Sequence, residues 1–182
     1  MRSTKHWLVL LLAVLVLAGA FATSCAPQEE EPDPTDTTEE EPEPTEEPDE
    51  TMTYDISLSA ADGVTTSASG SYSMEVDGNS ATFILNVEEL SDITMAHIHI
   101  AEEPDGSGPP AIWLYPDSQE PELMEGVTSG ELASGSFSES YFVGPLEGMT
   151  MDDLLAAIDE GRAYVNVHTS AYPDGEITGF LP

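Results

Sequence analysis

Three of the chain's four histidines lie in two short segments that could hold a transition metal. One segment reads Ala96-His97-Ile98-His99, and the other is the run 164–168, which ends in His168. Side chains two apart in a strand share a face, so His97 and His99 point together, and His168 joins them if its strand lies in the same sheet. Three imidazoles suit copper or zinc, with a carboxylate or water as a further ligand, and need ring nitrogens within roughly 3–4 Å of one another. Alternatively, the rings donate hydrogen bonds to buried carbonyls and hold the strands in register.

The element that must position His168 is a predicted hairpin from Gly161 to Phe180. Apolar residues alternate with polar ones in its first half, which is typical of a strand, and Tyr172-Pro173-Asp174-Gly175 is a turn signal. We expect Asn166 to satisfy backbone groups. Glu176 is expected to orient a histidine, to pair with Arg162 or to stabilise the turn. The remaining motif residues of the hairpin are Tyr164, Thr169 and Gly175.

Short alternating segments separated by turn signals account for most of the chain before this hairpin. The expected strands are 54–58, 69–76, 81–87, 94–100, 112–115 and 135–138, with a break at Leu90-Ser91-Asp92. One helix is predicted over Met151–Glu160, capped by Thr150 and ended by Gly161. Many short strands with one helix favour an all-β fold, an antiparallel, Greek-key-like β-sandwich with a short α-helix near the C-terminus.

The N-terminal residues 1–25 read as a signal peptide, with Arg2 and Lys5 before an apolar run. Two cleavage sites compete. Ala20-Phe21-Ala22 fits release of a soluble secreted protein, whereas 22–25 resembles a bacterial lipobox with alanine in place of the usual leucine. Cys25 is the chain's only cysteine and sits where a lipid-bearing cysteine should be, which favours a lipoprotein at the cell surface or on the periplasmic side of the membrane.

Residues 26–51 form a linker of repeated Glu-Pro and Asp-Pro that we expect to be disordered and extended. The folded domain is predicted over 52–182. The whole chain has 36 acidic residues against three Lys and Arg, which excludes nucleic acid and anionic lipid headgroups as partners. Such acidity fits either a salt-adapted (halophilic) protein or an acidic secreted protein from a moderate habitat.

The assembled motifs resemble those of the chordin (CHRD) domain family. The resemblance rests on Ala96-His97-Ile98-His99 with the Gly/Pro loop after it, on the short helix ending in Gly161, and on 164–169 followed by 173–177. It implies an extracellular all-β domain. Family members usually have arginine after the Gly-Glu-Ile segment, where this chain has Thr178. In animal chordin such domains accompany growth-factor-binding modules, but fold does not imply function, so growth-factor antagonism is not carried over.

Other candidate sites are weaker. The acidic loop 102–106 could bind calcium but lacks the ordered ligand spacing of a calcium loop. Trp113 and Tyr115 could form a ligand-facing patch or belong to the core. No nucleophile or phosphate-binding motif is present, so we expect no enzyme activity. The sequence favours a lipid-anchored, non-enzymatic binding or structural module that binds a protein or surface ligand, with a copper- or zinc-binding metalloprotein as the alternative.

Overall fold

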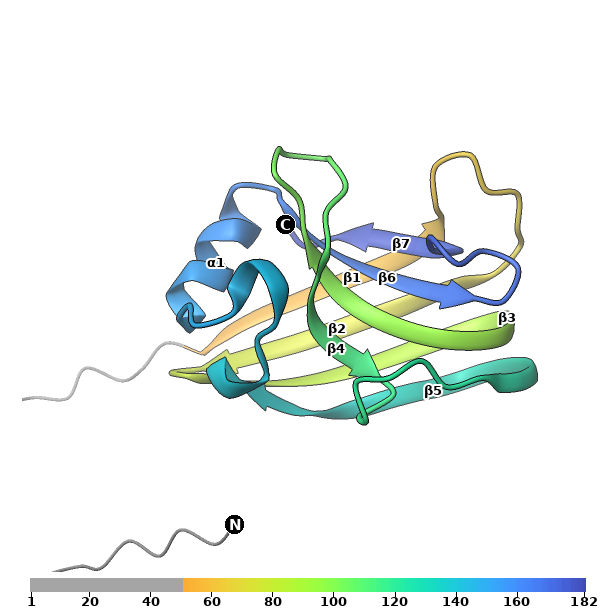
Figure 1. Cartoon of the computed structure of the whole chain (residues 1–182), viewed down its shortest axis with the longest axis horizontal. Coiled ribbons are helices and arrows are strands. Elements are labelled where there is room, and N and C mark those ends of the chain that lie inside the picture. The colour runs from red at the N-terminus through yellow and green to blue at the C-terminus, as the bar shows by residue number, and fades with distance from the viewer. Residues whose placement is uncertain (1–50) are drawn as a thin grey trace, which may run out of the picture. The chain divides into compact units, whose positions relative to one another are not determined.

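The computed structural model describes residues 51–182 (Figure 1). The expected signal peptide 1–25 with Cys25, and the linker up to residue 50, lie outside the described residues. Within them the strands are β1 (Met52–Ala60), β2 (Ser69–Asp77), β3 (Ser80–Ile100), β4 (Pro110–Tyr115), β5 (Met124–Ser138), β6 (Ala163–Thr169) and β7 (Ile177–Phe180). The helices are the 3₁₀ turns Glu139–Tyr141 and Gly144–Leu146 and the helix α1 (Met151–Asp159). No helix in this part of the chain has the length and hydropathy of a membrane span.

The strands form one antiparallel sheet that closes on itself. The order β2-β1-β7-β6-β3 returns to its start because β3 also pairs with β2, and β4 and β5 pair with β3 outside this ring. The predicted all-β class and the single short α-helix are therefore confirmed. The predicted sandwich is not what the pairing describes: five strands close into a barrel, and two further strands extend it.

The reason for the closure is the length of β3. We expected a break at Leu90-Ser91-Asp92, but β3 continues through these residues and is 21 residues long. Glu89 and Asp92 adopt positive φ there, and the register with β5 shifts on both sides of Leu90. Such bulges bend a strand. The first half of β3 pairs with β2 and the second half with β6, so one strand belongs to both sides of the barrel and no separate second sheet forms.

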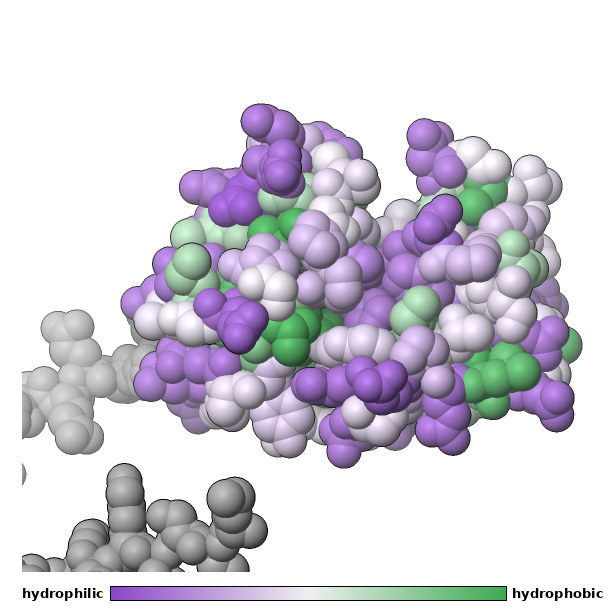
Figure 2. Space-filling view, in the orientation of Figure 1, coloured by the Kyte–Doolittle hydropathy of each residue, from purple (hydrophilic) through white to green (hydrophobic). Residues whose placement is uncertain are grey.

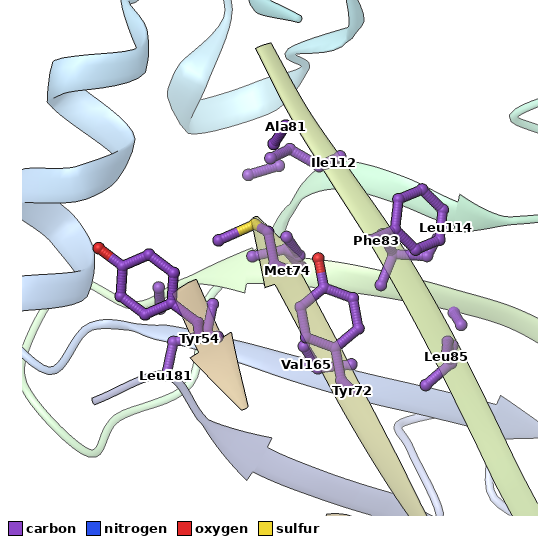
Figure 3. Packing of buried hydrophobic residues seen from close by; sticks show 14 of the residues in the cluster. Tyr54, Tyr72, Met74, Ala81, Phe83, Leu85, Ile112, Leu114, Val165 and Leu181 are labelled. Carbon is purple, nitrogen blue, oxygen red and sulfur yellow. The ribbon is translucent and has the colours of Figure 1, made fainter. Parts of the chain in front are cut away.

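The interior of the barrel is apolar. Tyr72, Met74 and Leu85 are fully buried side chains of β2 and β3, and Figure 3 shows them packed together with Phe83. The helix α1 adds Leu154 and Ile158, both without exposed surface, from the apolar stripe that the sequence predicted. Its Thr150 cap is present as a capping box with Asp153, which confirms the predicted helix start.

The predicted hairpin at the C-terminus is present as β6 and β7, paired antiparallel. All seven residues of β6 are buried. Its apolar side chains contribute to the barrel core, and its polar side chains lie on the other face, beneath the loops 101–109 and 170–176 that contact them. On the face of the domain shown in Figure 2, hydrophilic residues are interspersed with a few hydrophobic patches.

Candidate metal centre

The pairing of β3 with β6 brings the three histidines to one place on the outside of the barrel. Across the two strands His97 lies opposite Asn166, His99 opposite Tyr164, and Met95 opposite His168. Directly opposite residues share a face, so all three rings lie on the face away from the core. The rings are nevertheless buried, with exposed fractions of 2% for His97, 6% for His99 and 5% for His168.

One nitrogen of each ring faces the other two. Nδ1 of His97 is 3.2 Å from Nε2 of His168, and Nε2 of His99 is 3.3 Å from the same atom. A nitrogen of each ring lies within 4.8 Å of one on each of the others. With metal–nitrogen distances of about 2.0–2.1 Å, tetrahedral ligands are about 3.3–3.4 Å apart, so two of the three separations already match a shared ion.

Backbone carbonyls hold the far nitrogens of two rings. Nδ1 of His99 is 2.9 Å from the carbonyl oxygen of Gly108, and Nδ1 of His168 is 2.8 Å from that of Pro173. A carbonyl oxygen only accepts hydrogen bonds, so each Nδ1 bears the hydrogen and donates. In the neutral ring each Nε2 then presents a lone pair. Two lone pairs therefore face each other between His99 and His168, an arrangement that a cation stabilises.

The surroundings keep the rings neutral. Burial, with the neighbouring histidines His168 and His99, lowers the pKa of His97 to about 3. Burial also lowers the pKa of His99 to about 4, although the Gly108 carbonyl opposes the shift. For His168 burial again lowers the pKa, against opposing contributions from the Pro173 carbonyl and Asp174. At neutral pH all three rings are unprotonated at their lone pairs, which is the form that binds a metal.

Aromatic rings fix the histidines from the sides. Trp113 lies perpendicular to His97 with centroids 4.2 Å apart, and Tyr164 stacks on His99 at 4.9 Å. The Tyr164 hydroxyl donates to the Gly108 carbonyl and accepts from the Gly108 amide, so the same loop holds both rings. Nε2 of His97 is buried without a hydrogen-bond partner. His97 is thus the one ring whose tautomer no carbonyl fixes.

The other predicted motif residues support the hairpin beside the site. Asn166 donates from Nδ2 to the carbonyl of Asp174, in keeping with the backbone-satisfying role that we expected. Gly175 has φ +119° and packs so closely on the Asn166 amide that a Cβ there would clash with it. Thr178 donates its hydroxyl to the Val165 carbonyl at 2.9 Å.

The Glu176 carboxylate bonds neither to a histidine nor to Arg162, which were two of the partners that we expected. Its two carboxylate oxygens accept from the hydroxyls of Thr66 and Thr169, each at 2.7 Å. Arg162 instead pairs with Glu160 at 2.7 Å. The Glu176 carboxylate therefore ties the loop 61–68 to the end of β6.

The remaining candidate sites are the acidic loop 102–106 and the aromatic pair Trp113 and Tyr115. In the part of the chain that the structure describes, the three histidines are the one group of three or more His, Cys, Asp or Glu side chains with metal-binding geometry, so the carboxylates of the acidic loop 102–106 do not converge in such a group. Trp113 and Tyr115 are half-buried and line a cleft with Phe137 and Tyr141. Tyr115 also packs against the core, and the Trp113 indole touches His97, so a ligand-facing role of the two aromatic residues stays a prediction.

Sequence reasoning missed the parts of the site that come from the backbone. The carbonyls of Gly108 and Pro173 set two tautomers, and no residue type encodes a carbonyl. Thr66 was also missed because it lies 110 residues from Glu176. The sequence offered one indication that Gly108 matters, which is its place in the Gly/Pro loop after His99. In the structure a Cβ at this position would overlap the Ile100 carbonyl.

Comparison with known proteins gives one match. The model of the CHRD domain matches residues 54–181, most of the chain and almost all of the described part. Neither a curated protein nor a solved structure matches the sequence. The matched range contains the histidine pair, the short helix and the hairpin, which are the motifs that carried the resemblance. The chain therefore belongs to the CHRD domain family.

Proposed function

We propose that this CHRD domain is an extracytoplasmic metal-binding module that holds one copper or zinc ion between His97, His99 and His168. The observation that carries the proposal is the pair of Nε2 atoms of His99 and His168, which face each other at 3.3 Å while both ring hydrogens are directed to carbonyls. A purely structural histidine pair would place a hydrogen between the two nitrogens.

The same tautomers supply a ready-made site. Both carbonyl contacts orient a ring so that its Nε2 points at the centre, the arrangement by which outer contacts raise ligand basicity in metal sites. His97 completes the set through Nδ1, its hydrogen moving to the unpartnered Nε2. We propose a binding role without catalysis, because the rings are buried and no nucleophile accompanies them. The lipid anchor on Cys25 would hold the module at a membrane surface, a proposal supported by the sequence pattern alone.

A structural module is the second candidate. Nδ1 of His97 lies at hydrogen-bonding distance from Nε2 of His168, and the carbonyl bonds of His99 and His168 fasten two loops to the sheet. In that case each histidine substitution destabilises the fold by about 1–3 kcal/mol and added metal has no specific effect.

Metal analysis of the full chain, purified without an affinity tag, tests the proposal. We expect one ion per chain, and metal in thousandfold excess over its dissociation constant should raise the free energy of unfolding by about 4 kcal/mol. His97→Gln, His99→Gln and His168→Gln should each abolish this gain. Tyr164→Phe is the matched control, because it loosens the Gly108 loop but keeps all three ligands.

The measurement is made at high salt, since the many carboxylates bind divalent ions loosely everywhere. Trp113 adds a second readout, because its ring centroid lies 4.2 Å from that of His97. Cu²⁺ bound to His97 should quench the Trp113 fluorescence, and Trp113→Phe identifies that signal. Equal metal-induced shifts in the wild type and all three histidine variants would reject the metal site in favour of the structural role.

A further inference from the structure

The ligand group at the histidine site has no charge. Three neutral imidazoles supply the nitrogens, and among the described residues no Asp or Glu oxygen belongs to the group. The cost of burying an ion grows with the square of its charge, so a divalent ion in such a site costs about four times as much to desolvate as a monovalent one. A neutral ligand set therefore penalises the burial of a divalent ion more than that of a monovalent one, although three histidines also form zinc sites.

The number of nitrogen ligands also favours a monovalent ion over Zn²⁺ or Cu²⁺. Zinc sites are almost always four-coordinate, and a three-histidine site completes zinc with an open water position. Trp113, which contacts His97, lines one cleft, and Tyr164, which stacks on His99, lines another together with Asn166; no histidine lines either cleft. Cu²⁺ prefers a tetragonal set of nitrogen and oxygen ligands, and among the described residues no carboxylate joins the three histidines to complete one.

A soft donor stands beside the three rings. Met95 lies directly opposite His168 in the β3–β6 pairing, and two residues before His97 on the same strand. It is half-buried, yet it is not among the residues of the apolar core or those packed against it, in contrast to its neighbour Ala96. Met95 therefore belongs to the face of the histidines.

The pairing with His168 is close enough for the Met95 sulfur to reach the site by a change of side-chain rotamer. Opposite residues in an antiparallel pair have Cβ atoms about 4.5–5.5 Å apart, and methionine has three rotatable bonds with which to place its thioether. Thioether sulfur is a ligand that selects Cu⁺ among the common metal ions. From the neutral ligand set, the burial and this placement we infer that the site takes Cu⁺, with the Met95 thioether joining His97, His99 and His168. This inference rests on the proposed function and names its ion.

The test compares two metals and two methionines in the full chain. Cu⁺ affinity is measured without oxygen by competition with a colorimetric Cu⁺ chelator, and Zn²⁺ affinity with a zinc indicator. Met95→Leu keeps the apolar volume and removes the sulfur. Met124→Leu is the control, since Met124 packs against the core instead.

We expect the wild type to bind Cu⁺ more tightly than Zn²⁺. Met95→Leu should weaken Cu⁺ binding by about tenfold or more and leave Zn²⁺ binding within about twofold, whereas Met124→Leu should change neither. X-ray absorption of the Cu⁺-loaded wild type should show a sulfur neighbour that Met95→Leu lacks. Unchanged Cu⁺ affinity in Met95→Leu, or tighter Zn²⁺ than Cu⁺ binding, would overturn the inference while the metal site stands. Loss of all specific metal binding would overturn both.

Discussion

Nε2 of His99 and Nε2 of His168 lie 3.3 Å apart, and the hydrogen of each ring is directed away, to the carbonyl of Gly108 or of Pro173. Two loops far apart in the sequence thus fix the same tautomer on two facing rings. Burial lowers the pKa of both rings and keeps them neutral, and from this the pH behaviour of the metal-free protein follows.

The metal-free domain should lose stability as the pH falls from about 6.5 towards 4. An unfolded histidine has a pKa near 6.5, whereas the folded pKa values are lowered to about 3 for His97 and about 4 for His99. Between these limits the unfolded chain binds protons that the folded chain does not, so the free energy of unfolding decreases with falling pH. Each such histidine contributes up to about 1.4 kcal/mol per pH unit.

Chemical denaturation of chelator-treated protein between pH 5 and 6.5 measures this slope. His99→Gln should have a slope shallower by about one proton. An identical slope in the variant would show that His99 is not held neutral in the folded state.

Gly175→Ala should destabilise the hairpin beside the metal site. Gly175 has φ +119°, and a Cβ would overlap the amide of Asn166. The free energy of unfolding should fall by about 1–3 kcal/mol from backbone strain and by about 1–3 kcal/mol from overpacking. Gly130→Ala is the matched control, because Gly130 has φ +109° with nothing within 4 Å of its Cβ position. Thermal unfolding should rank the wild type above Gly130→Ala and both above Gly175→Ala. Equal melting temperatures for the two variants would mean that the Asn166 contact relaxes freely.

Salt should stabilise the domain. Residues 53–182 contain 23 acidic residues against Arg162 alone, a net charge of −22 with neutral histidines. The Debye length shrinks from ~10 Å at 0.1 M to ~3 Å at 1 M salt, which weakens self-repulsion. We expect the melting temperature to rise with sodium chloride well beyond physiological concentration. Sucrose at equal osmolality separates screening from exclusion effects. A flat or falling curve in sodium chloride would count against salt adaptation.

Cys25 should bear the lipid anchor. In a bacterial host the processed protein should fractionate with membranes, and its mass should include diacylglyceryl and acyl groups. Cys25→Ala should accumulate as an unprocessed precursor, while Cys25→Ala with a strong A-x-A site in place of 20–22 restores a soluble product as a control. A native product that is soluble and begins at Thr23 would establish the competing cleavage site.

Local sequence determined much of the fold. Alternation predicted β6 because its apolar side chains recur with period two, and Thr150 with Gly161 predicted the helix because capping depends on neighbouring residues. The range matched by the CHRD family includes both of these elements. The sequence could not show whether the two strands that bear the histidines lie in one sheet. His97 and His168 are 71 residues apart, and pairing over such a distance depends on the fold.

Closure of the barrel was decided by tertiary structure. The polar run at Leu90-Ser91-Asp92 reads as a break, but bulges let β3 bend and continue, because each half finds a different partner strand. The burial of the histidine face was decided in the same way. Alternation places polar residues outside the core, yet whether loops cover that face depends on where the chain returns.

The sequence alone therefore determined the residue types that can bind a metal, their shared parity and the elements that display them, because these follow from short-range geometry. Only the tertiary structure decided that the rings meet at 3.2 and 3.3 Å, that Gly108 and Pro173 set two tautomers, and that Met95 stands beside His168. Those relationships depend on strand register and on backbone carbonyls. Both arise from packing between residues far apart in the chain, and neither leaves a mark on the residue types themselves.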